Sequence, residues 1–190
     1  MSYKDNVTHM LLVSVAATLL VFLCSAENFV SDGTWMVTHV QTCENPEQYP
    51  FKMNFEKRKV NRTHDGLSME GEFPEDITAA IGIIIEVYVR CEGGYKFSEN
   101  MSDVSMCGLL NKYAKNVWEG MLSTAGVNPP NCPVPKGPFS MSNYVIGYNQ
   151  LPTQGKVGDY MAFVNMMKGP TKVGCLTLFC TFTPLDDEDE

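Results

Sequence analysis

Cysteine is the residue type in this 190-residue chain whose number and placement are most suited to specific chemistry. Six of the seven cysteines follow an apolar N-terminal segment, at Cys43, Cys91, Cys107, Cys132, Cys175 and Cys180. An even number behind a secretion signal favours three disulfide bonds formed in an oxidising compartment. Zinc is the weaker interpretation, because the chain has no Cys-x-x-Cys pair and only two histidines after that segment. We therefore expect disulfides and no metal site.

Catalytic signatures are few. The chain lacks a Gly-x-Ser-x-Gly elbow, a His-Glu-x-x-His helix and a P-loop. His39 and His64 follow the apolar segment, and no motif supplies either with triad partners. His64 adjoins Asp65 at an expected turn, where an exposed histidine without catalytic function is the better interpretation. We expect no catalytic residues, no cofactor and no enzymatic activity.

The N-terminus has the features of a signal peptide. Residues 10–23 form an apolar run that is short for a membrane span and suited to a signal peptide, and Cys24-Ser25-Ala26 provides small residues for cleavage after Ala26. Because the flanking charge is only weakly basic, an uncleaved anchor is the alternative. We expect a signal peptide over 1–26, one β domain over 27–184, a disordered acidic tail over 185–190, and a secreted, extracellular protein.

Two sequons follow this segment, Asn61-Arg62-Thr63 and Asn100-Met101-Ser102. Each lies next to an expected turn or loop, so a secreted chain is expected to be glycosylated at Asn61 and Asn100.

The charge distribution excludes one class of partner. The formal net charge is −8, and the five acidic residues 186–190 carry −5 of it, which leaves −3 for the rest. The one basic run, Lys57-Arg58-Lys59, is best interpreted as a solvated strand end. Nucleic acid is therefore not an expected partner.

Period-two alternation dominates the hydrophobic pattern and predicts a mainly β domain. The clearest case is the row Ile77, Ala79, Ile81, Ile83, Ile85, Val87, Val89 and Cys91, which share one face of an expected strand over 77–91. Other strands are expected over 35–43, 51–56, 67–73, 139–145, 160–166 and 174–180. A helical stripe predicts one helix, Ser105 to Leu122, with Asp103 or Ser105 as its cap, and Pro129 and Pro130 forbid its continuation.

The order of several short motifs resembles a known family. They are Cys132-Pro133 with Gly137, Leu151-Pro152, Gly158-Asp159-Tyr160, Gly174-Cys175-Leu176, and upstream 60–63 and 103–107. Over roughly residues 30–183 the chain resembles the secreted insect chemosensory A/B-type proteins, which are related to the ganglioside activator protein and to ML (lipid-recognition) domains. It departs from the ganglioside activator in lacking additional cysteines between the helix and Cys132.

The resemblance implies an antiparallel β-sandwich or β-cup with one helix, tied by disulfides, whose sheets separate to hold an apolar ligand. It also implies the bonds Cys107–Cys132 and Cys43–Cys175, which leaves Cys91 with Cys180. Strand parity supports that third pair, because both cysteines share the apolar row of their own strands. Expected ligand contacts on inward faces or beside the helical stripe are Phe55, Met69, Ile83, Ile85 and Trp118.

The expected function is therefore that of a secreted protein that holds an apolar small molecule or lipid, such as a pheromone or cuticular hydrocarbon, between two sheets. Transport or presentation, with a membrane receptor as a further partner, would follow from such binding. The many methionines favour this interpretation, since Met lines adaptable apolar surfaces. The alternative is a β-sandwich with a filled core that binds a receptor or another protein through its surface.

Overall fold

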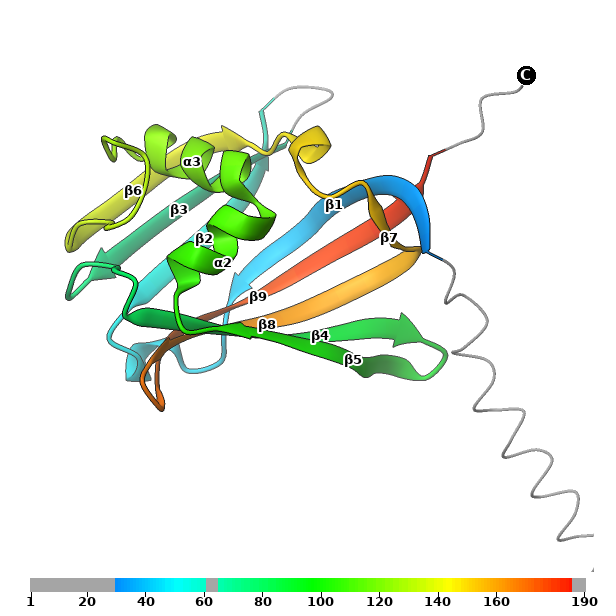
Figure 1. Cartoon of the computed structure of the whole chain (residues 1–190), viewed down its shortest axis with the longest axis horizontal. Coiled ribbons are helices and arrows are strands. Elements are labelled where there is room, and N and C mark those ends of the chain that lie inside the picture. Colours follow the sequence, from blue (N-terminus) through cyan, green and yellow to red (C-terminus); the bar gives the residue numbers. More distant parts are fainter. Residues whose placement is uncertain (1–29, 61–64, 186–190) are drawn as a thin grey trace, which may run out of the picture.

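Over the residues that the structure describes, the chain forms two antiparallel sheets, two α-helices and two short 3-10 helices, a mainly β architecture as the sequence predicts (Figure 1). The computed structural model describes residues 30–60 and 65–185. The six-stranded sheet has the order β5-β4-β8-β9-β1-β7 and the three-stranded sheet the order β2-β3-β6. The elements are β1 (Val30–Thr42), η1 (Pro46–Gln48), β2 (Lys52–Lys59), β3 (Asp65–Phe73), β4 (Ile81–Cys91), β5 (Gly94–Asp103), α2 (Met106–Tyr113), α3 (Lys115–Thr124), β6 (Gly137–Val145), η2 (Tyr148–Gln150), β7 (Gln154–Lys156), β8 (Gly158–Lys168) and β9 (Thr171–Pro184).

Some expectations fall outside the described residues. These are the signal peptide over 1–26, the glycosylation of Asn61 and the acidic tail from residue 186 onward. Within the described residues, neither helix has the length and apolar character needed to cross a bilayer.

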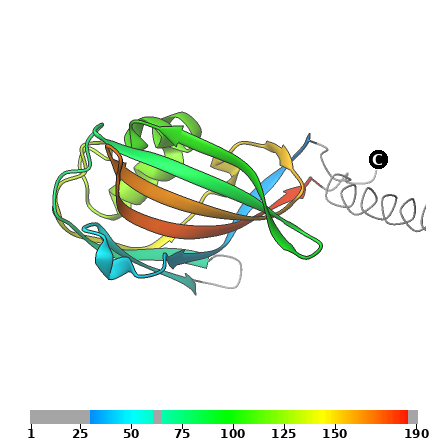
Figure 2. The same cartoon turned by 90° about the horizontal axis from the view of Figure 1, so that it is seen from below.

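The six-stranded sheet, here called the large sheet, has two unlike faces. Strand pairing places Ile83 of β4, Met166 of β8 and Gly174 of β9 in one row, and all three are buried. The helices and the three-stranded sheet lie on this side, which we call the inner face (Figure 1). Figure 2 looks onto the other side, the outer face, over which no element of the described chain lies.

The main hydrophobic core fills one end of the space between the sheets. Alternation on β2, β3 and β6 turns the apolar residues of the small sheet inward and leaves Lys52, Glu70 and Glu72 outside. The core also takes side chains from both helices and from the loop before β6. Its most completely buried members are Phe51, Phe73, Ile77, Ile81, Ile83, Leu122, Val134 and Met141.

A second, smaller cluster closes the opposite end of the large sheet. The ring of Trp35 lies 5.3 Å from that of Tyr160 and 4.9 Å from that of Phe182. Phe182 is completely buried, and its ring lies against the main chain at Gly155, where an added Cβ would come within 2.9 Å of it. Such contacts require glycine, because any side chain would displace the ring.

The single expected helix is wrong, because the segment forms two helices that meet at Ala114 (φ −146°, ψ 37°). Ser105 caps α2 as predicted, accepting a hydrogen bond from the amide of Gly108 at 3.1 Å. The break has a packing cause. Helix α2 contacts β4 and β5 whereas α3 contacts β6, and one straight helix does not reach both surfaces. Tyr113, the last residue of α2, is exposed at the junction.

Two strand expectations also need correction. Strand β4 begins at Ile81 rather than Ile77, which instead forms an isolated bridge with Val134. Strand β5 was not predicted, and it places Asn100 in an exposed edge strand rather than a loop.

Two of the three implied disulfides are present. Cys43 is bonded to Cys175 (Cα–Cα 5.7 Å) across the β1–β9 pair, and Cys107 at the start of α2 is bonded to Cys132 (6.2 Å).

The Cys91–Cys180 pair is wrong, because Cys180 is a free thiol. Parity correctly places both cysteines on the inner face, but β8 lies between their strands. Two strand spacings of about 4.8 Å each exceed the separation of roughly 7 Å that a disulfide tolerates.

Candidate functional site

A band of half-buried aliphatic side chains crosses the inner face of the large sheet, between the main core and the Trp35 cluster. Pairing aligns Ile85, Val164 and Leu176 in one row, and Val87, Ala162 and Leu178 in the next. Ala162 is buried, while the other five are only partly covered. We call Ile85, Val87, Val164, Leu176 and Leu178 the inner band. It is apolar surface on the interior side of a sheet that the fold does not fully bury.

The elements opposite the large sheet leave apolar side chains in the same intermediate state. Phe55 comes from β2, Leu110 from α2, Trp118 and Met121 from α3, and Ile146 from the segment after β6. Each packs against the main core without being completely covered. Partly covered apolar groups therefore come from both layers of the sandwich, which is the lining expected of a site for an apolar molecule.

The five predicted ligand residues all belong to the core or pack against it, but they differ in exposure. Met69 and Ile83 are 7% and 2% exposed and belong to the hydrophobic core. Phe55, which pairs with Met69, is half-buried, as are Ile85 and Trp118. Of the five, these three have surface left for contact with another molecule.

Trp118 has an unusual polar feature. Its indole Nε1 is buried and has no hydrogen-bond partner among the described residues. A buried donor without an acceptor costs about 1–3 kcal/mol, and most buried tryptophans find one. An oxygen of a bound molecule could supply the missing acceptor.

The free thiol of Cys180 continues the inner face beyond the band, in a row with Val89, Tyr160 and Val37. Burial among these groups raises the pKa of Cys180 to about 11. The thiol is therefore protonated at neutral pH and poorly suited to nucleophilic chemistry. Sequence reasoning assigned this cysteine to a disulfide and so did not consider it as part of an interior surface.

A polar seam closes the junction between β1 and β2. The ammonium of Lys57 donates hydrogen bonds to the carbonyls of Val37 (3.0 Å) and Thr38 (3.3 Å) and forms an ion pair with Asp65 (2.9 Å). Tyr148 also donates to the Val37 carbonyl, at 3.3 Å. The Lys57 ammonium lowers the pKa of Asp65. The hollow between these groups measures about 10 Å³, so the seam is essentially shut.

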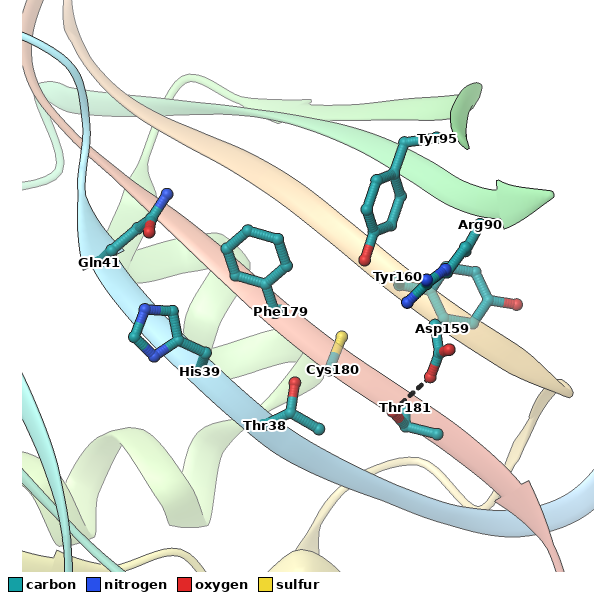
Figure 3. A pocket seen from close by; sticks show the side chains of 10 residues that line it. All are labelled: Thr38, His39, Gln41, Arg90, Tyr95, Asp159, Tyr160, Phe179, Cys180 and Thr181. Atoms are coloured by element: carbon teal, nitrogen blue, oxygen red, sulfur yellow. Dashed lines mark hydrogen bonds between the residues drawn. The ribbon is translucent and has the colours of Figure 1, made fainter. Parts of the chain in front are cut away.

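A larger hollow of about 280 Å³ lies on the outer face (Figure 3). The ring of Phe179 lies 5.8 Å from that of His39 and 6.3 Å from that of Tyr95. Arg90 and Asp159 stand at one end, where Asp159 accepts a hydrogen bond from Thr181 at 2.7 Å. Sequence reasoning missed this site, because strand β5, which supplies Tyr95, was not predicted and the pairing of β1, β8 and β9 was not known.

Over residues 30–60 and 65–185, no three His, Cys, Asp or Glu side chains gather as metal ligands would. His39 contacts the ring of Phe179. The described residues present apolar surface on the inner face and mixed aromatic and polar side chains on the outer face.

Residues 83–162 match the model of one protein family. The family is described as a protein of unknown function (DUF1091), and the match runs from β4 into β8. The matched segment therefore includes Ile85 and Val87 of the inner band, both helices and the edge strand β5. No curated protein matches the chain.

Proposed function

We propose that this protein is a secreted binding protein that holds an apolar small molecule or lipid between its two sheets, for transport or presentation. The inner band carries the proposal. Five aliphatic side chains on the interior side of the large sheet are only partly buried, although they lie between two well-buried clusters. Full burial of such a side chain from water is worth about 1.5–3 kcal/mol, so covering the remaining exposed part of one would contribute up to about 1 kcal/mol.

Affinity would come mainly from this apolar surface. At about 25 cal/mol per Å², a ligand that removes about 300 Å² of apolar surface from water gains roughly 7 kcal/mol of binding free energy. The cost of its lost translational and rotational freedom is then subtracted from this gain. The unpaired Trp118 Nε1 adds one directional contact, which favours a ligand with an oxygen atom over a pure hydrocarbon. A fatty acid, an ester or a long-chain alcohol meets both requirements. No reaction is proposed.

A second candidate function is a β-sandwich that binds a receptor or another protein through its surface. The outer face favours it, because the 280 Å³ hollow and the exposed ring of Phe97 both lie there. Aromatic side chains and arginine, both present on this face, are common at the centres of protein interfaces. Under this alternative no ligand would contact the inner band, and neighbouring side chains would cover it instead.

Mass spectrometry of lipids extracted from the purified secreted protein separates the two functions. The carrier proposal predicts an apolar molecule released in roughly equimolar amount, and its replacement when the stripped protein is incubated with a long-chain fatty acid or alcohol. A secreted protein of similar size from the same host is the control for adventitious lipid. Neither release nor uptake above that control would contradict the carrier function and leave the surface-binding alternative.

A further inference from the structure

Phe97 is an exposed aromatic residue on the outer face of the edge strand β5. Its side chain is 59% exposed, and its ring meets that of Tyr88 edge-on at 5.7 Å. Tyr88 in turn meets Phe163 edge-on at 5.5 Å. The three rings form a rigid aromatic surface on a sheet, and its outermost member has one side open to solvent.

A β-bulge brings Asn100 onto the same face as Phe97. In the β4–β5 pair, Tyr88 lies opposite Phe97 and Glu86 lies opposite Asn100, with an irregularity between Val87 and Tyr88 that accommodates the extra residue Ser98. Tyr88 and Glu86 are two residues apart and share a face, so their partners share it also. Without the bulge, residues three apart would point to opposite faces.

Asn100 begins the sequon Asn100-Met101-Ser102, and its side chain is exposed. Because the bulge absorbs one residue, Asn100 lies about 7 Å from Phe97 along the strand, the length of two extended residues. A sugar linked to Asn100 can span that distance. The C–H groups on one face of N-acetylglucosamine carry a partial positive charge, which the negative face of an aromatic ring attracts.

We propose that Asn100 carries an N-linked glycan whose first N-acetylglucosamine packs on the ring of Phe97. The inference requires passage through the secretory pathway and is independent of any ligand on the inner face. It accounts for the exposed ring, since the sugar covers it. It also protects β5, the long edge strand of the large sheet, whose unpaired main-chain groups could otherwise pair with another chain.

The test combines two glycan states with two proteins, the wild type and Phe97→Ala, both secreted from eukaryotic cells. Peptide mass spectrometry first measures occupancy of Asn100. Thermal unfolding then compares protein trimmed to a single N-acetylglucosamine with protein from which the glycan is fully removed. Ser102→Ala, which removes the sequon and leaves Asn100 intact, controls for effects of the enzymatic treatment.

We expect Asn100 to be occupied and the single sugar to maintain the melting temperature of the wild type. Complete removal should lower it by about 3 °C, the shift expected from a contact as strong as an aromatic pair in a domain of this size. The same removal should lower that of Phe97→Ala by less than about 1 °C, because the partner ring is absent. An unmodified Asn100, or an equal loss in both proteins, would overturn the proposal.

Discussion

The ammonium of Lys57 on β2 lies 3.0 Å from the carbonyl oxygen of Val37 on β1, and this contact joins the two sheets. Strand β1 pairs with β7 only over Val30–Asp32, so the remainder of that edge meets β2 without a strand ladder. A charged side chain therefore satisfies carbonyl groups that a neighbouring strand would otherwise bond. The seam keeps the interior of the sandwich closed on this side.

Replacing Lys57 by methionine keeps the aliphatic stem and removes the ammonium. We expect the free energy of unfolding to fall by about 1–3 kcal/mol, because the hydrogen bonds from a charged, largely buried ammonium to two main-chain carbonyls are lost. Urea unfolding measures the change. Lys168→Met is the matched control, since Lys168 forms an exposed pair with Glu75 at 2.7 Å and should cost less than about 1 kcal/mol. Equal losses in the two variants would contradict the role of the seam.

The Lys57–Asp65 pair makes a prediction about pH. Lys57 lowers the pKa of Asp65 in the folded protein, so this carboxylate stabilises the fold above its unfolded value of about 3.9 and stops doing so as the pH falls through the lowered folded value. Asp65→Asn should therefore be less stable than the wild type at pH 7, and the difference should shrink below about pH 4.

Melting temperatures of both proteins between pH 7 and pH 2.5 test this prediction. The same substitution in the Lys57→Met background is the control, because without the ammonium the pH dependence of the difference should disappear. A difference between wild type and Asp65→Asn that stays constant over the whole range would be inconsistent with the ion pair.

The thiol of Cys180 reports on the inner face. With a pKa of about 11, its alkylation by iodoacetamide should be slow at pH 7 and should accelerate about tenfold per pH unit up to pH 10. An ordinary thiol with a pKa near 8.5 would level off by about pH 9.5. Intact-protein mass spectrometry under native conditions follows the reaction. Complete modification within minutes at pH 7, or an early plateau, would contradict the burial of this thiol.

The sequence predicted best the elements whose two faces differ most. The segment from Ile81 to Cys91 carries an apolar residue at every second position because one side of β4 faces inward, and the structure confirms that strand over 81–91. Strand β5 was not predicted, because it lies at an edge of the sheet and carries mostly polar residues. It also contains the bulge at Ser98, which breaks the period of two. The Gly93-Gly94 turn, with φ of +87° and +113°, was the available signal for a hairpin.

Tertiary relationships were harder to predict. Parity gave the correct face for Cys91 and Cys180 but could not reveal that β8 lies between their strands. The helical stripe could not show that α2 and α3 contact different strands. Likewise, Ile83 and Ile85 share one face of β4 and a residue type, yet Ile83 is buried in the core and Ile85 is half-buried. The difference depends on which elements cover each residue, and no local pattern encodes it.

The central claim, that an apolar ligand occupies the inner band, is tested most directly by comparing two adjacent residues of β9. Leu178 lies in the inner band, whereas Phe179 lines the hollow on the outer face. Leu178→Trp fills space on the inside, and Phe179→Ala removes the aromatic floor outside. Ile85→Phe adds less volume at a neighbouring inner position, which guards against a failure of the tryptophan variant to fold.

The measurement is displacement of a fluorescent long-chain fatty acid from each protein, with circular dichroism to establish folding. We predict that the folded inner-face variants bind the probe at least about tenfold more weakly than the wild type, a loss of about 1.4 kcal/mol, and that Phe179→Ala binds it as the wild type does. Unchanged binding in both folded inner-face variants, or loss of binding in Phe179→Ala alone, would contradict a ligand site between the sheets.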